Sequence, residues 1–69
     1  MNPAEIRKLE AYLKQTFKGV DLSVRGMPRK ADSAEVYVNN EFVGLISKDT
    51  DEGELSYHLT MTILDIDLE

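Results

Sequence analysis

The spacing of the apolar residues changes once along the chain, at Gly19, and this change constrains the fold more than any other sequence feature. Before Gly19 the apolar residues recur at the spacing of an amphipathic helix: Ile6, Leu9, Leu13 and Phe17. After Gly19 apolar and polar residues alternate, which is typical of half-buried strands. The sequence therefore predicts an α+β fold, with one N-terminal amphipathic helix packed on one face of a four-stranded antiparallel sheet.

The helix has recognisable start and stop signals. Asn2 is a good N-cap, Pro3 suits the first helical position, and Glu5 is placed to complete a capping box. Gly19 suits the positive φ of a helix end, and Lys18 suits its negative dipole. These signals predict a helix over residues 3–18.

Turn residues divide the remaining chain into strands. Residues 26–28 (GMP) end the first strand and lead into a polar loop over residues 29–33. Asn39-Asn40 forms a plausible two-residue hairpin turn because Asn tolerates positive φ. Residues 49–54 form another turn, with Gly53 as its positive-φ residue.

The strand pattern also predicts which side chains face the helix. In the last strand the alternation changes phase at Leu64, which requires a bulge, a bend or a change of buried face. We expect the following residues to face the helix: Val36, Val38, Val43, Leu45, Leu55, Tyr57, Leu59 and Met61. The opposite, outer face should then carry Tyr37, Phe42 and Ile46, with Leu64, Ile66 and Leu68 joining it after the phase change.

The length of 69 residues allows one domain, residues 1–69, with a thin core. Small domains usually gain stability from disulfides, a metal or a partner chain, and the absence of Cys excludes the first. With no Cys and one His, carboxylates are the only plentiful metal ligands, so we expect no cofactor. A partner chain is the remaining source of stability, which raises the chance of a homo-oligomer. The absence of Cys fits a cytoplasmic location, and the charged residues among the first fifteen leave no signal-peptide core. The longest apolar stretch, residues 42–46, is too short for a membrane span, so we expect no membrane partner.

Charge is divided unequally between the two halves of the chain. Residues 1–30 contain seven basic and three acidic residues, a net charge of +4, whereas residues 31–69 contain one basic and ten acidic residues, a net charge of −9. The two halves can attract each other within one molecule or between two. The alternative is that the basic half binds an anion or nucleic acid through the cations of one loop, Arg25, Arg29 and Lys30.

Four parts of the chain stand out as a pattern: residues 28–38 (PRKADSAEVYV), 41–44 (EFVG), 51–54 (DEGE) with 56–57 (SY), and 63–68 (ILDIDL). Together they resemble a short alphaproteobacterial family of unknown function. The resemblance covers nearly the whole chain and implies a bacterial cytoplasmic protein. It implies no catalytic or binding residues.

No segment has the pattern of a catalytic or metal site. The acidic turn that begins at Asp49 lacks EF-hand spacing, because Gly53 is fifth rather than sixth and Thr60 stands where the bidentate Glu belongs. It is an acidic hairpin turn, with weak cation binding left open. His58 is the only His and has no nucleophile motif to serve, and Asp65 and Asp67 are explained as the polar half of an alternating strand. We expect no enzyme.

The surplus of apolar residues is the stronger functional signal. An exposed apolar patch on a small domain usually marks an interface. The sequence therefore predicts a non-catalytic interaction or self-associating protein that uses the outer sheet face or an edge strand. Its predicted interface residues are Tyr37, Phe42, Ile46, Leu64 and Ile66. The opposing interpretation is that the C-terminal segment folds over this face, or that these side chains are scattered and individually harmless.

Overall fold

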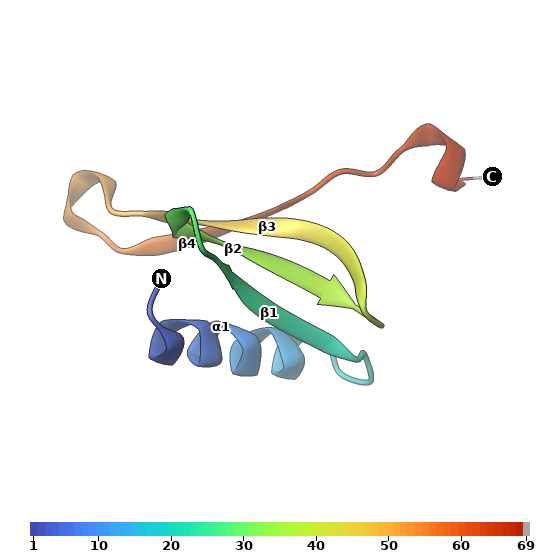
Figure 1. Cartoon of the computed structure of the whole chain (residues 1–69), viewed down its shortest axis with the longest axis horizontal. Coiled ribbons are helices and arrows are strands. Elements are labelled where there is room, and N and C mark those ends of the chain that lie inside the picture. The colour runs from blue at the N-terminus through green and yellow to red at the C-terminus, as the bar shows by residue number, and fades with distance from the viewer. Residues whose placement is uncertain (69) are drawn as a thin grey trace.

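The computed structural model describes residues 1–68, apart from the side chain of Glu52. One helix is followed by four strands in sequence order β1-β2-β3-β4, and each strand is antiparallel to the next (Figure 1). The predicted α+β fold, a helix packed on a four-stranded antiparallel sheet, is therefore confirmed. The elements are α1 (Pro3–Thr16), β1 (Leu22–Met27), β2 (Lys30–Val38), β3 (Glu41–Asp49) and β4 (Ser56–Met61), with short 3-10 turns η1 (Asp51–Gly53) and η2 (Asp65–Leu68).

The helix begins with the predicted capping box. The backbone N–H of Glu5 donates to the side chain of Asn2, and the Glu5 carboxylate in turn accepts from the Asn2 backbone N–H. The helix ends at Thr16, two residues earlier than predicted, with Phe17 as its C-cap. Gly19 has a φ of +82°, as expected of the residue that redirects the chain into the sheet.

Six buried apolar residues form the core between the helix and the sheet. They are Leu13 of α1, Leu22 and Val24 of β1, Ala34 and Val36 of β2, and Ile46 of β3. The helix packs mainly along β1, the edge strand nearest to it (Figure 1). β4 contributes no buried residue, so the core lies toward the β1 side of the sheet.

The β2–β3 hairpin contains the predicted turn and also an irregularity that was not foreseen. Asn39 and Asn40 have φ of +51° and +67°, which confirms the two-residue turn. Tyr37 pairs with Phe42, but Val36 pairs with Gly44, so Val43 is an extra residue in β3. A bulge of this kind changes which face the following side chains occupy.

The bulge overturns part of the predicted facing pattern. Ile46 is only 2% exposed and belongs to the core beneath the helix, so its assignment to the outer face is wrong. Leu45, predicted to face the helix, pairs with Glu35 on the outer face and is partly exposed. The physical reason is that the period of two restarts after Val43, which the sequence pattern alone does not reveal.

Gly44 allows β3 and β4 to approach each other closely next to this bulge. A Cβ atom at Gly44 would lie 2.6 Å from the carbonyl oxygen of Thr60 and 3.2 Å from the Cβ of Met61. Both neighbours belong to β4, so only a residue without a side chain lets β3 and β4 approach each other here.

Two element boundaries also differ from the prediction. β2 begins at Lys30, so most of the expected polar loop over residues 29–33 is strand, and Pro28 and Arg29 form the turn. β4 ends at Met61, so the phase change at Leu64 lies beyond the sheet. Leu55, expected to face the helix, precedes β4 and is exposed.

Replacement of Leu13 by Ala tests the docking of the helix. We expect Leu13→Ala to lower the free energy of unfolding by about 2–5 kcal/mol, because it leaves a cavity in the small core. Denaturant unfolding would measure this loss. Gln15→Ala, an exposed position on the same helix, is the matched control and should change stability by less than about 0.5 kcal/mol. Equal effects of the two substitutions would contradict the observed packing.

Replacement of glycines in two strands tests the close approach at the bulge. Gly44→Ala should destabilise the protein by about 1–3 kcal/mol, because its new methyl group meets the β4 backbone. Gly26→Ala is the control, since its methyl group would meet only the flexible tip of Ile6, at 2.8 Å from Cδ1. Thermal or denaturant unfolding should therefore show a larger loss for Gly44→Ala than for Gly26→Ala; the reverse order would contradict the bulge geometry.

Candidate functional site

An uncovered apolar surface lies on the helix side of the sheet, beside the helix rather than beneath it. Two adjoining hollows of about 350 and 360 Å³ form one groove between α1 and the β3–β4 half of the sheet, and both include Leu59. We call this the helix-side groove. Its lining is apolar except for the Tyr hydroxyls: Leu9, Tyr12, Leu13, Phe17, Val20, Leu22, Val36, Val38, Val43, Ile46, Tyr57, Leu59 and Met61.

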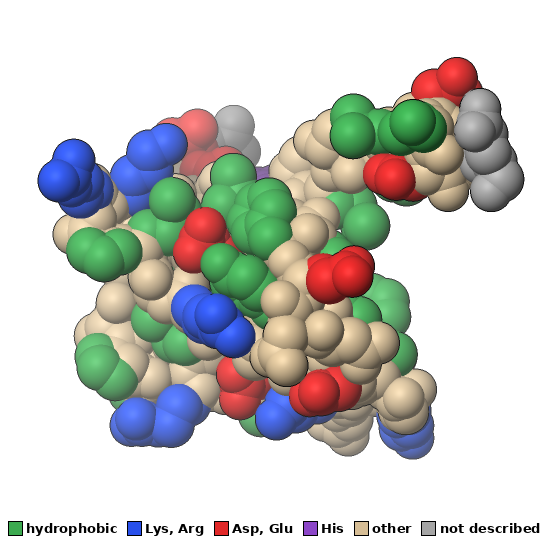
Figure 2. Space-filling model, turned by 45° about the vertical axis from the view of Figure 1, so that its right-hand side comes forward, with side chains coloured by type: hydrophobic (Ala, Val, Ile, Leu, Met, Phe, Trp, Pro, Cys, Tyr) green, Lys and Arg blue, Asp and Glu red, His purple; other side chains and the backbone are tan. Residues whose placement is uncertain are grey.

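Several side chains of this groove are strongly exposed. Tyr12 is 66% exposed and Met61 is 54% exposed, and Phe17, Val20 and Leu59 are each between 39% and 46% exposed. Figure 2 shows apolar side chains reaching the surface of the molecule between charged groups. The groove therefore offers an apolar surface that the rest of the described chain leaves open.

The segment after β4 forms a second uncovered apolar surface. We call residues 62–68 the tail. Pairing between β3 and β4 ends at Gly44 and Met61, and the tail then runs away from the sheet to η2 (Figure 1). The backbone N–H of Asp67 donates to the carbonyl of Leu64 at 2.9 Å, which closes the final turn. The apolar side chains of the tail are 55–71% exposed: Ile63, Leu64, Ile66 and Leu68.

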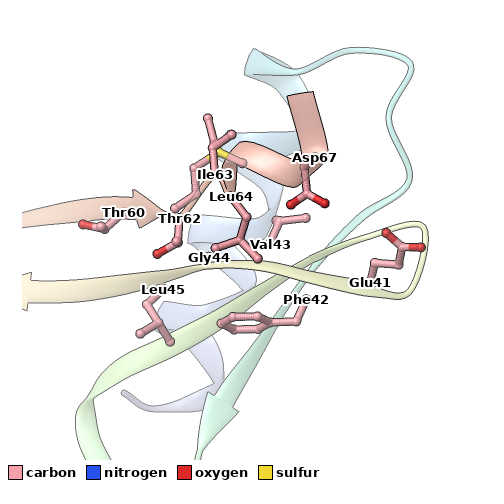
Figure 3. Close-up of a pocket in the computed structure, with 11 residues that line it drawn as sticks. Glu41, Phe42, Val43, Gly44, Leu45, Thr60, Thr62, Ile63, Leu64 and Asp67 are labelled. Atoms are coloured by element: carbon pink, nitrogen blue, oxygen red, sulfur yellow. The ribbon is translucent and has the colours of Figure 1, made fainter. Parts of the chain in front are cut away.

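The tail and the first part of β3 enclose a third hollow of about 600 Å³. Figure 3 shows Leu64 of the tail beside Val43 and Gly44, and the carboxylates of Glu41 and Asp67 at one end. The hollow exists because the β3–β4 ladder stops at Gly44, so residues 41–43 and the tail separate. The hollow therefore forms the inner side of the tail.

One polar cluster ties the helix to the far half of the sheet. The Glu5 carboxylate accepts from the Tyr57 hydroxyl at 2.6 Å and lies 2.7 Å from Nζ of Lys48. The hydrogen bond with Lys48, followed by that with Tyr57, lowers the pKa of Glu5 from 4.5 to about 2. The same carboxylate raises the pKa of Lys48 and that of Tyr57. Glu5, Lys48 and Tyr57 therefore have a structural role, because their contacts hold the start of the helix against the sheet.

The outer face of the sheet contains two of the predicted interface residues in an internal stack. The rings of Tyr37 and Phe42 meet edge to face, with centroids 5.8 Å apart and planes at 74°. The guanidinium of Arg25 lies 4.0 Å above the Tyr37 ring, and the Tyr37 hydroxyl donates to Glu35 at 3.3 Å. The outer-face patch therefore differs from the predicted one, because Ile46 is absent from it and Leu45 is present instead.

The structure brings together part of the remaining sequence-predicted site residues. Leu64 of the tail lines the 600 Å³ hollow together with Phe42, whereas Ile66 is outside that lining and is 70% exposed. Arg29 lies in the β1–β2 turn and Lys30 begins β2, whereas Arg25 is on the outer face of β1 with its guanidinium 4.0 Å from the Tyr37 ring.

The acidic turn and His58 have local partners. The Asp51 backbone N–H donates to the Asp49 side chain at 2.9 Å, and His58 Nε2 lies 3.4 Å from the Asp49 carboxylate. Gly53 has the expected positive φ, at +77°. Within residues 1–68, no group of three or more His, Cys, Asp or Glu side chains is arranged to hold a metal ion. No helix in that range has the length and apolar content to cross a membrane.

Comparison with known families gives a match over residues 5–67 to the model of DUF3126, described as a protein of unknown function. The chain belongs to the DUF3126 family. No curated protein and no solved structure shows significant similarity to it. Membership of DUF3126 confirms the resemblance to a family of unknown function, and it assigns no activity.

Sequence analysis missed the helix-side groove although a signal was present. A helix with its side chains is about 10–12 Å wide, whereas four strands at about 4.8 Å spacing form a sheet about 19 Å wide. One helix therefore covers only about half of such a sheet. The alternating apolar residues Leu59 and Met61 on the last strand were the signal, because they fall on the half that no second helix covers.

The lowered pKa of Glu5 predicts a loss of stability in acid. Because the pKa falls from 4.5 to about 2 on folding, the stabilising bonds are complete above about pH 4.5 and are lost as the pH falls toward 2. Glu5→Gln should therefore be less stable than wild type at pH 7, and the difference should shrink below pH 4.5. Denaturant unfolding from pH 7 to pH 2 would measure it. Lys48→Met removes the main cause of the lowered pKa of Glu5, so the stability of this variant should also depend less on acid pH. If both variants lose stability between pH 7 and pH 2 as wild type does, the role of Glu5 is contradicted.

Proposed function

We propose that this protein is a small non-catalytic interaction protein that acts by self-association through the helix-side groove and the tail. The observation that carries the proposal is the amount of surface. The chain exposes 5536 Å², whereas a compact monomer of 7.8 kDa exposes about 4,400 Å². The excess of about 1,100 Å² exceeds the roughly 800 Å² that each partner contributes to a standard protein–protein interface.

The shape of the molecule supports the same proposal. The radius of gyration is 12.8 Å, compared with about 11 Å for a compact domain of 69 residues, and the longest dimension is 42 Å against 24 and 23 Å for the others. Large apolar side chains of the groove and the tail are exposed, which favours burial against another polypeptide over exposure to water.

The alternative function is the binding of an anion or nucleic acid through the basic N-terminal half. The stacking of Arg25 on Tyr37 and the net charge of −5 give it less support than self-association has. A bacterial cytoplasmic setting, which the family resemblance and the lack of Cys suggest, is part of the proposal.

The molecular mass in solution tests self-association. We expect sedimentation equilibrium of the wild-type protein to show a mass above 7.8 kDa that rises with concentration. Moderate salt should leave an apolar interface largely intact, whereas binding through phosphate contacts would weaken steeply. A mass of one chain at every concentration would contradict self-association, and binding of DNA at physiological salt would favour the alternative.

A groove substitution locates the interface. Tyr12→Ser should weaken association by at least tenfold, because Tyr12 is an exposed aromatic on the groove wall. Gln15→Ser on the same helix, outside the groove, is the matched control and should leave association unchanged. Circular dichroism would confirm that both variants remain folded. Equal behaviour of the two variants would place the interface elsewhere.

A further inference from the structure

We infer that the occupant of the helix-side groove is the tail of a second copy of this chain, so that two copies exchange tails reciprocally. The inference rests on the proposed self-association and specifies its partner and its contacts. Within residues 1–68, each chain has an open apolar groove and an uncovered apolar segment. In a closed dimer with exchanged tails, each groove is covered by the tail of the other copy. Two-fold dimers are the commonest symmetric assembly.

The position of Met61 makes this exchange geometrically simple. Met61 is the last residue of β4 and lines the groove, so the tail starts at the rim of the groove. A two-fold axis close to Met61 would therefore place the start of each tail next to the groove of the other copy. The tail already extends away from its own sheet, so the exchange needs no unfolding of the domain (Figure 1).

The local sequence disfavours return of the tail to its own groove. To enter that groove the chain would have to reverse direction directly after Met61. The next residues, Thr62, Ile63 and Leu64, include two β-branched side chains that favour an extended backbone. Of the residues that favour tight turns, Gly, Pro and Asn do not occur after Gly53, and the two Asp residues of the tail, Asp65 and Asp67, lie in η2, four and six residues beyond Met61. The tail therefore continues outward and is available to a second copy.

Charge complementarity favours the same occupant. The charged residues of the tail are acidic, Asp65 and Asp67, and no ion pair forms at either within residues 1–68. On the helix that forms the groove wall, both carboxylates already have partners: Glu5 with Lys48, and Glu10 with Lys14. The helix and the turn that follows it carry three further cations, Arg7, Lys8 and Lys18, which are exposed and lie outside the groove lining itself. An acidic apolar segment fits beside this wall better than a basic one would.

A double-cysteine variant tests the direction of the exchange. The natural chain contains no Cys, so Val20→Cys in the groove and Ile66→Cys in the tail introduce the only thiols. Treatment with a short bis-maleimide should give a covalent dimer on a denaturing gel, with the two new residues linked between chains. The control pairs Ile66→Cys with Ser47→Cys, an exposed residue on the opposite sheet face, and should give little cross-linking. A link within one chain would overturn the inference.

Matched leucine substitutions test the energetic role of the tail. Leu68→Ser should weaken dimerisation by at least tenfold, because Leu68 is 71% exposed in the single chain and becomes buried in the dimer. Leu55→Ser makes the same change at a leucine that is 57% exposed but lies outside the groove and the tail, and should leave dimerisation unchanged. Sedimentation equilibrium measures both, and circular dichroism confirms folding.

The outcomes separate this inference from the proposed function. If Leu68→Ser dimerises like wild type, or the double-cysteine variant forms no interchain link although the wild type is dimeric, the tail exchange is wrong and self-association stands. Pairing through the open edge of β4 would give that result. If the wild type stays monomeric, both fail. Weakening by Leu68→Ser together with the interchain link supports the exchange.

Discussion

The difference in width between one helix and four strands is the constraint on which the rest of this structure depends. The helix packs along β1 and buries a core that includes residues of β1, β2 and β3 but none of β4. A single layer of one helix on a wider sheet leaves part of the apolar face open unless a second element covers it. The helix-side groove is therefore a direct consequence of the element order, and its apolar lining shows that the open half is not adapted to water.

Carboxylates at two positions of the helix fix its placement on the sheet. The Glu10 carboxylate accepts the backbone N–H of Val24 at 2.9 Å, which caps an otherwise free donor on edge strand β1. Glu5 reaches in the other direction to Tyr57 and Lys48, on β4 and β3. The two contacts bracket the apolar stripe, so the helix cannot roll toward β4 to close the groove without losing one of them. The edge formed by β1 is thus protected, and the edge formed by β4 is the open one.

The sequence predicted the features that depend on local chemistry. The capping box at Asn2, the Asn39-Asn40 turn and the positive φ of Gly19 and Gly53 are each determined by a few adjacent residues, and all are observed. The facing pattern failed where it depended on pairing across strands. The bulge at Val43 lies next to Gly44, which closely approaches β4 about sixteen residues away in the chain, and it moves Ile46 into the core.

The same distinction, between features set by adjacent residues and features set by pairing across strands, explains why the sequence did not reveal the course of the tail. The phase change at Leu64 was visible in the sequence, but whether the strand bends, bulges or leaves the sheet depends on whether β3 offers it a partner. Val43 is the extra residue of the bulge, and β3 starts directly after the turn at Asn40. The pairing between β3 and β4 ends beside this bulge, at Gly44. The tail then leaves the sheet with its apolar side chains uncovered. One extra residue in β3 therefore removes Ile46 from the predicted outer-face patch and contributes to the release of the segment that we propose as the partner of the groove.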